Sequence, residues 1–395
     1  MVFAGERCFK LHRIMLIAMG LWPYQKPFIW RMQAVFFFSV YCFSLFSQFT
    51  PFFTRPCNME CILKRFSYIC NTFVYIMNYY SFYFNSDAVK QMFEHMQLDW
   101  KIFKNNDAMN IFEEYLFESY IFAVSTNILV LIGGFGFIII ECRSIILDII
   151  IPMLTHKSRP RQLEMDLELF VDKEHYFFLY LGQELLVIGI GTWSMLTTGT
   201  FLTTVTKHSC ATYKIVSYLI QNTVTVHTLQ LPVVQRIQYM RRNICLSVYL
   251  HRRTLEFCKG LLLSFDMWYF PLLLVAVLSL SCILFRLYNA IIQFDELYGI
   301  LVSCITLGCY FVYMFMGNFL GQTYTEHSVE VLDSTYDTLW YVAPLPIQKL
   351  FLIMQKSIRS HKIILCGLFV ASIEGFSALV TSAVSYFTVM HAMRS

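Results

Sequence analysis

Long uncharged runs recur along this chain at the length of a bilayer crossing, and no other feature constrains its fold as strongly. A helix needs about 20 apolar residues, at 1.5 Å each, to cross the roughly 30 Å apolar layer of a membrane. Only 14% of the 395 residues are charged, whereas 57% are hydrophobic and 17% are aromatic. Soluble domains carry about 25% charged residues. The sequence therefore predicts an all-α polytopic membrane protein.

We predict seven transmembrane helices. One further uncharged run, residues 215–235, contains Gln, Asn, His and Thr side chains and breaks at Pro232. These polar groups oppose insertion, so we interpret the run as an amphipathic cytosolic continuation of the fourth helix. An eight-span protein is the alternative. The seven predicted spans are residues 34–50, 66–86, 119–140, 176–206, 267–285, 297–325 and 363–393.

The distribution of Lys and Arg predicts the orientation. With a cytosolic N-terminus, the cytosolic segments hold five of these residues before the first span, three between the second and third, eight between the fourth and fifth, and four between the sixth and seventh. Twenty of the 30 basic residues are then inside. Cytosolic loops carry such an excess, so we expect a cytosolic N-terminus and, with seven spans, an extracellular C-terminus.

The predicted organisation has six parts. Residues 1–30 form a cytosolic segment with an interfacial helix, and residues 31–206 hold helices 1–4 with an extracellular loop at 143–175. The remaining parts are a cytosolic helical extension at 207–266, helices 5 and 6 at 267–325, a cytosolic anchor helix at 326–362 and a pore-lining seventh helix at 363–395.

Enzymes and nucleic-acid-binding proteins fit this sequence poorly. The chain has no G-x-S-x-G, H-E-x-x-H, P-loop or dinucleotide-binding motif. Its ten His are dispersed, and we expect none to pair with a second metal ligand at helical spacing, so neither a metal nor a cofactor is predicted. The net charge of +4 is too small to indicate nucleic-acid binding.

Two other classes of membrane protein are alternatives. Residues Glu141-Cys142-Arg143 look like the acid-Arg motif of G-protein-coupled receptors, but that motif needs an extracellular N-terminus, and residues 382–386 lack N-P-x-x-Y. A transporter usually needs several intramembrane charges or paired broken helices. Here only Glu184 and Glu374 lie within predicted spans.

A series of short motifs, ordered along the chain, resembles insect odorant receptors. The resemblance spans the whole chain and is strongest after Gly317. The N-terminal stretches at 20–24, 82–86 and 171–177 are similar to versions common in ants, bees and wasps. The C-terminal motifs are Gly317-Asn318-Phe319, Glu326-His327-Ser328, Tyr336-Asp337-Thr338-Leu339-Trp340-Tyr341, Gln348-Lys349, Leu352-Ile353-Met354-Gln355-Lys356-Ser357 and Ser385-Tyr386-Phe387-Thr388.

This resemblance implies an odorant-gated, non-selective cation channel of four subunits around one pore. Tuning subunits of the family assemble with a shared co-receptor that carries a long insertion before the fifth span. This chain lacks that insertion, so it resembles the odour-binding subunit. The resemblance also implies the plasma membrane of sensory dendrites, a small volatile or cuticular organic ligand, contact with membrane lipid and no need for a G protein. A gustatory receptor channel is the related alternative.

The seventh predicted helix has a stripe of small, hydroxyl and apolar residues. Such a stripe is typical of helix packing in membranes. The family pattern places Val389 and Met393 at a hydrophobic constriction, where apolar rings close a pore by dewetting. We therefore predict that Ser385, Val389, Ala392, Met393 and Glu374 line the pore or gate. The stripe comprises Thr381, Ser385, Thr388, Val389, Ala392 and Met393.

Two intramembrane carboxylates are predicted. Glu374 stands eleven residues past residue 363, about 16 Å along a helix. It either lines the inner pore or bonds to a neighbouring subunit, and a structural carboxyl is the alternative. For Glu184, in the outer half of the fourth span, a contact with loop backbone is favoured.

A ligand site should be an apolar, aromatic-lined cavity with a few polar groups. We predict it in the outer half of the bundle, where glycines of the third span leave room opposite aromatic residues of the second. For each residue alone, core packing is the alternative. The candidates are Thr72, Phe73, Tyr75, Ile76, Tyr79, Gly133, Gly134, Gly136, Phe137, Tyr180, Ile188, Tyr298, Val302 and Ile305.

Two further features are predicted outside the spans. The family resemblance implies that the cytosolic helices form the main subunit contact, and Trp340 and Tyr341 are our candidates, because aromatic residues anchor interfaces. Packing within one subunit is the alternative. Cys57 and Cys61 are open to a local disulfide if their loop is extracellular.

Overall fold

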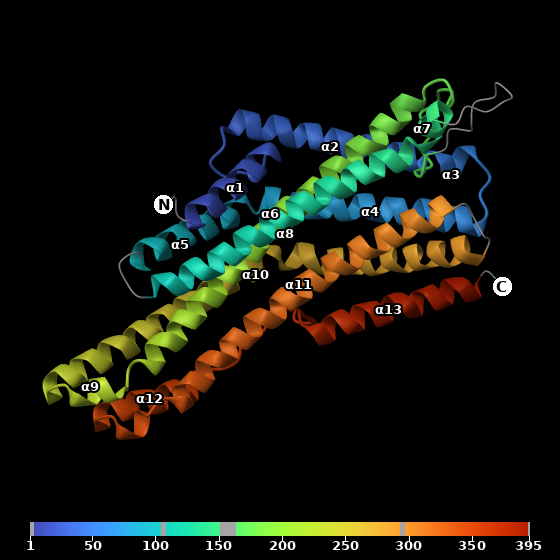
Figure 1. The fold of residues 1–395 in the computed structure, drawn as a ribbon. Helices are drawn as coiled ribbons and strands as arrows, with labels where there is room; N and C mark the ends of the chain where they lie inside the picture. Colours follow the sequence, from blue (N-terminus) through green and yellow to red (C-terminus); the bar gives the residue numbers. More distant parts are fainter. Residues whose placement is uncertain (1–3, 104–107, 151–162, 293–296, 394–395) are drawn as a thin grey trace.

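The computed structural model describes residues 4–103, 108–150, 163–292 and 297–393, and long helices dominate it (Figure 1). Most helices run along one direction and form an elongated bundle. The helices are α1 (Ala4–Ala18), α2 (Pro27–Phe49), α3 (Pro51–Thr54), α4 (Met59–Phe84), α5 (Ser86–Phe103), α6 (Met109–Glu141), α7 (Arg143–Ile150), α8 (Phe177–Gln221), α9 (Val226–Gln230), α10 (Val233–Ile292), α11 (Leu297–Asp337), the 3₁₀ helix η1 (Trp340–Val342), α12 (Leu345–Ser357) and α13 (Ile373–Ala392).

Six helices within the described residues are long and apolar enough to cross a membrane: those that contain α2, α6, α8, α10, α11 and α13. The seventh, α4, has 26 residues and a more polar composition, and two of its Asn side chains bond to neighbouring helices inside the bundle. Asn78 Nδ2 donates to Thr198 Oγ1 of α8 at 2.8 Å, and Asn71 Oδ1 accepts from Ser279 Oγ of α10 at 2.6 Å. The predicted all-α, seven-helix polytopic fold is confirmed.

Three of the helices extend well beyond the length of a membrane crossing. α10 has 60 residues, α8 has 45 and α11 has 41. Their far ends meet α9, η1 and α12 at one end of the molecule, called the α12 end below (Figure 1). A buried core joins them there, with Tyr213 of α8 and Tyr324 of α11 hydrogen-bonded through their hydroxyls at 2.9 Å. Residues 207–266 are thus helical apart from the two turns around α9.

The C-terminal span differs from the prediction. Residues 363–372 do not begin a helix, because β1 (Ile364–Leu365) and β2 (Phe369–Val370) pair as a small antiparallel hairpin. α13 starts at Ile373, where the Ser372 hydroxyl accepts a hydrogen bond from the backbone N–H of Gly375 at 3.0 Å and caps the helix. Glu374 therefore lies in the first turn of α13 with an exposed side chain. The prediction that it lies about eleven residues into a helix is wrong.

The opposite end of the bundle, called the α7 end below, carries α3, α7 and the beginnings of α4, α8 and α11 (Figure 1). Cys57 and Cys61 form a disulfide there, just before and within the first turn of α4. Chain segment 163–168, which is neither helix nor strand, lies at this end before α8 begins. We call this segment the strap.

Candidate functional site

α13 packs on α10 and α11 along only one of its faces. Ala383 is fully buried, and Phe376 and Leu379 pack into the same apolar cluster. Near its C-terminal end, the imidazole Nε2 of His391 lies 2.9 Å from the hydroxyl of Tyr288 on α10. Among the described residues of this helix, Ala383 alone is buried. The remainder of the helix surface is available to lipid or to other subunits.

The predicted pore stripe lies on the open face of α13. At 100° per residue, Thr381, Ser385 and Ala392 point away from Ala383. Glu374 falls on the same side, two turns before Thr381. The side chains of Val389 and Met393 are 55% and 63% exposed. The structure thus leaves this stripe uncovered in one subunit.

The predicted ligand residues of α4 lie at different depths. Thr72 and Tyr79 are fully buried and already bonded: Thr72 Oγ1 lies 3.0 Å from Gln48 Nε2, and the Tyr79 hydroxyl donates to the Met19 carbonyl at 3.1 Å. Ile76 is half-buried. The side chain of Phe73 is 39% exposed, so it does not point into the bundle core.

Tyr75 has a distinctive partner on the neighbouring helix. Its ring lies directly over Gly191 of α8, where a Cβ atom would overlap three ring carbons. Gly191 therefore makes the room that the aromatic side chain of Tyr75 occupies. Glycine is required at this position so that the Tyr75 ring of α4 can approach α8 closely. Gly191 is not among the residues predicted from the sequence.

Of the predicted ligand residues on α8 and α11, the two tyrosines are hydrogen-bonded and the three aliphatic residues differ in burial. The Tyr180 hydroxyl donates to the Val171 carbonyl at 3.0 Å, so this buried side chain fixes the loop before α8. Tyr298 donates to Glu141 Oε1 at 2.8 Å. Ile188 packs beside Tyr180. Within α11, Val302 is buried and Ile305 is exposed.

The glycine cluster of α6 is not where the sequence analysis expected it. Gly133 and Gly134 are exposed, and a Cβ on either of them, or on Gly136, would meet no atom within 4 Å. Phe137 is half-buried beside them. α6 packs mainly on α8 and α1 rather than on α4. The structure thus does not bring these glycines opposite the aromatic residues of α4.

The strap alternates apolar and acidic residues, Leu163-Glu164-Met165-Asp166-Leu167-Glu168. The three apolar side chains are buried in a cluster with Tyr180 and Tyr68. The acidic side chains bond to basic partners on the other side. Asp166 accepts from Arg65 at 2.7 Å and from Arg55 at 3.1 Å. These apolar and ionic contacts together hold the strap on the α7 end of the bundle.

Glu164 is the most buried acidic residue of the strap. Its carboxylate forms an ion pair with Arg286 of α10, accepts from the Tyr68 hydroxyl at 2.6 Å and lies 3.5 Å from Lys64. Burial alone would raise the pKa of Glu164, but Lys64, Arg286 and the Tyr68 hydrogen bond hold it below its usual value. Glu164 is thus a buried carboxylate whose negative charge is balanced by Arg286 and Lys64.

Two helix carboxylates hold the strap backbone. Glu141 Oε2 accepts from the N–H of Glu164 at 3.4 Å, and Glu184 Oε1 accepts from the N–H of Met165 at 3.3 Å. The favoured interpretation of Glu184, a contact with loop backbone, is confirmed. Neither the strap nor Arg286 is among the residues predicted from the sequence, although the alternation of apolar and acidic residues at 163–168 is a visible signal.

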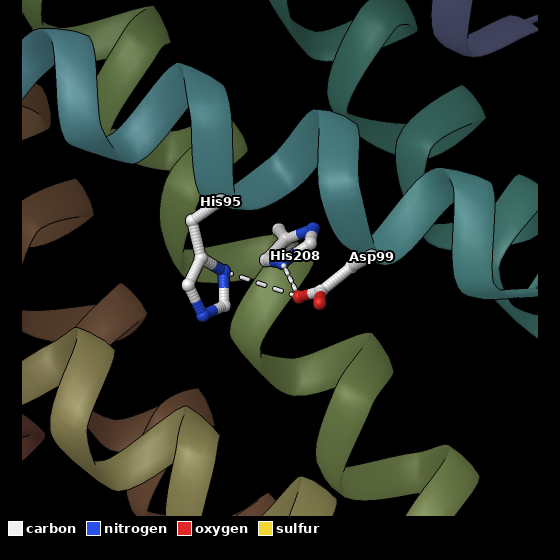
Figure 2. A group of neighbouring side chains, drawn as sticks. All are labelled: His95, Asp99 and His208. Atoms are coloured by element: carbon white, nitrogen blue, oxygen red, sulfur yellow. Dashed lines mark hydrogen bonds and ion pairs between the residues drawn. The ribbon is translucent and has the colours of Figure 1, made fainter.

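A second buried charged cluster joins α5, α8 and α10, and Figure 2 shows three of its side chains, His95, Asp99 and His208. The Asp99 carboxylate lies 3.1 Å from His95 Nδ1, 3.0 Å from His208 Nε2 and 2.8 Å from an Arg253 guanidinium nitrogen. The expectation that no His pairs with a second ligand at helical spacing is wrong, because His95 and Asp99 are four residues apart. Their ligand atoms and that of His208 lie within 4.8 Å of one another.

The partners of this cluster favour an ion-pair network. Burial alone would raise the pKa of Asp99, but hydrogen bonds from His208 and His95 hold it well below its usual value. Arg253 Nε also donates to His95 Nε2 at 3.1 Å, so His95 has a donor on one nitrogen and the carboxylate on the other. The network ties α5 to the long helices.

Trp340 and Tyr341 form the 3₁₀ turn η1 at the α12 end. Trp340 packs partly into the core shared by α8, α10 and α12. Tyr341 is 61% exposed, next to exposed Val342 and Leu345. Tyr341, rather than Trp340, is therefore the aromatic residue open to another subunit.

The comparisons with known proteins agree with this geometry. Solved structures of the insect olfactory receptor OR5 from Machilis hrabei are similar to this chain, one of them in complex with eugenol, with TM-scores of 0.75 and 0.74. Each shares 12% sequence identity, and the match covers 97% of both chains. Comparison with curated protein sequences gives no significant match. A family model described as 7tm Odorant receptor matches residues 58–384, so the chain belongs to the seven-transmembrane odorant receptor family.

Proposed function

We propose that this chain is the odorant-binding subunit of a ligand-gated, non-selective cation channel. The observation that carries the proposal is the open stripe of α13, which a single subunit leaves uncovered. Four subunits around an axis would cover it by facing one another. A co-receptor subunit is the proposed partner, with Tyr341 in the contact at the cytosolic end and the plasma membrane as the location.

The proposed ligand is a small, mostly apolar organic molecule. The OR5 structure from Machilis hrabei holds eugenol, a small aromatic molecule. In this chain, the predicted ligand region in the outer half offers Tyr75 over Gly191, half-buried Ile76 and Ile188, and buried Val302. Such a mixture of aromatic and aliphatic side chains suits an apolar ligand.

The proposed gate is formed by Val389 and Met393, one turn apart on the exposed side of α13. With their copies or the co-receptor's counterparts, they would form two apolar rings that exclude water when closed. Ser385 and Ala392 would line the pore beside them, and Glu374 would lie at its inner entrance.

The test is whole-cell recording of Val389→Asn with the co-receptor at matched surface expression. A polar ring lowers the cost of wetting, so we expect basal current without ligand to increase. Val384→Asn is the matched control, since Val384 is also exposed on α13 but lies well to one side of the stripe. Unchanged basal current and ion permeability in Val389→Asn would show that the stripe serves helix packing.

A second measurement separates the channel from a metabotropic receptor. A channel subunit should give odour-evoked current that persists when G-protein signalling is blocked. Loss of the current under that block, together with staining of an N-terminal tag on intact cells, would favour the metabotropic alternative.

A further inference from the structure

A cavity of about 250 Å³ lies at the α12 end, far from the proposed odour site and pore. Its walls come from α8, α10, α12 and the segment that follows α12. Val216, Leu255 and Met354 make an apolar wall. The volume is just below the usual range for small-molecule sites, so it suits a ligand of a few heavy atoms.

Every ionisable side chain that lines this cavity is basic: His251 and Arg252 from α10, with Arg359 and His361 from the segment after α12. The two imidazole rings lie 6.0 Å apart between centroids. The serine hydroxyls of the lining, Ser247 and Ser357, are further hydrogen-bonding groups. A cavity with this set of groups favours an anion.

One buried nitrogen of the cavity lacks a partner. The Nδ1 atom of His251 is buried and has no hydrogen-bond partner within the described part of the chain. The ring of His361, which is half-buried, bonds to the backbone of Arg359, and the His361 backbone N–H donates to Ser328 Oγ at 3.0 Å. Leaving a buried polar atom such as His251 Nδ1 unpaired is costly, and a ligand that bonds to it would remove that cost.

The two arginines are available to such a ligand. Arg252 pairs with Glu256 at 2.9 Å, but both side chains are largely exposed, and a surface pair of this kind contributes little. Arg359 is exposed at the rim. Arginine bonds phosphate oxygens with two parallel N–H groups, which makes it well suited to this anion.

We propose that this cavity binds a phosphate-bearing anion. The phosphate lies between Arg252 and Arg359, the imidazoles of His251 and His361 bond to its oxygens, and the apolar wall covers the carbon part of the ligand. Either a soluble phosphomonoester or the head group of an anionic lipid has this chemistry. The site is independent of odorant binding and of the proposed pore.

The test uses the full-length receptor in nanodiscs at constant ionic strength, and follows its thermal unfolding midpoint. One arm adds glycerol 3-phosphate to phosphatidylcholine nanodiscs. The other arm increases the phosphatidic acid content of the nanodiscs without soluble phosphate. Because ligands that bind only the folded state raise the unfolding midpoint, we expect a saturable increase in at least one arm.

The decisive variant is Arg252→Gln with Arg359→Gln. Each charge-assisted bond to phosphate contributes roughly tenfold in affinity, so the double variant should bind at least about tenfold more weakly. The matched control is Arg242→Gln with Lys349→Gln, which removes the same charge from exposed positions outside the cavity.

The outcomes separate clearly. A saturable effect of glycerol 3-phosphate that only the cavity variant loses supports the site with a soluble ligand, and the same pattern with phosphatidic acid alone supports it with a lipid. No saturable effect in either arm overturns the proposal. Equal losses in the cavity variant and its control overturn it as well, because they indicate non-specific charge attraction.

Discussion

Gly191→Ala tests whether the contact between α4 and α8 shapes the odour site. A Cβ at Gly191 would overlap the Tyr75 ring, so the ring must turn or the helices must separate. Overpacking of this kind costs about 1–3 kcal/mol. The better helix propensity of Ala offsets about 1 kcal/mol of that cost. We therefore expect a folded receptor in which the Tyr75 ring has moved.

The expected functional change follows from the loss of one aromatic contact. An aromatic contact is worth about 0.5–1.5 kcal/mol, which corresponds to roughly a 2- to 13-fold shift in the half-maximal odour concentration. The assay is whole-cell recording with the co-receptor over a panel of volatile phenols, esters and terpenes. Basal current should stay near normal, because Gly191 and Tyr75 lie away from α13.

Gly189→Ala is the matched control on the same helix. Gly189 is exposed, and a Cβ there meets no atom within 4 Å. This substitution should leave odour sensitivity unchanged. Identical dose–response curves for the two variants at equal surface expression would refute the reasoning, since they would show that Tyr75 does not contact the ligand.

Three further predictions concern the charged clusters and the subunit contact. Asp99→Asn removes the buried carboxylate that pairs with the partly buried Arg253 and should lower stability by up to about 3 kcal/mol in an SDS titration, whereas Asp87→Asn on the exposed first turn of α5 should change it by less than about 1 kcal/mol. Glu164→Gln should cost about 3 kcal/mol and speed proteolysis at the strap, and exposed Glu174→Gln should do neither. Because the pKa of Glu164 is held below its usual 4.5, its contribution is present at neutral pH and is lost as the pH falls below about 4.5. Tyr341→Ala should reduce co-purification with the co-receptor at unchanged surface expression, and undiminished co-purification would remove Tyr341 from the contact.

Local periodicity placed the stripe residues on one face of α13, because which residues share a face depends only on the helical repeat. The start of that helix was not predictable from hydropathy. Residues 363–372 are more apolar than the helix itself, yet Gly367 takes a left-handed conformation in a hairpin and Ser372 caps the helix after it. An apolar run does not distinguish a short hairpin from a helical turn.

Which glycine makes a close contact between helices was likewise not predictable from the sequence. The G-G-F-G cluster of α6 was conspicuous in the sequence, but it faces outward, and the isolated Gly191 makes the close contact with Tyr75. A glycine creates room only where another element approaches it. Which glycine does so depends on how helices pack, and sequence spacing within one helix carries no information about this.

The sequence by itself determined that this chain is an all-α membrane protein of seven helices, because crossing a bilayer imposes a length and an apolar composition on each segment separately. It also gave the family resemblance, which rests on the order of short motifs. The tertiary structure alone decided the buried charge pairs. Glu164 meets Arg286 across 122 residues and Asp99 meets His208 across 109. A buried charge is stable only beside a compensating partner, and the fold rather than the local sequence brings the two together.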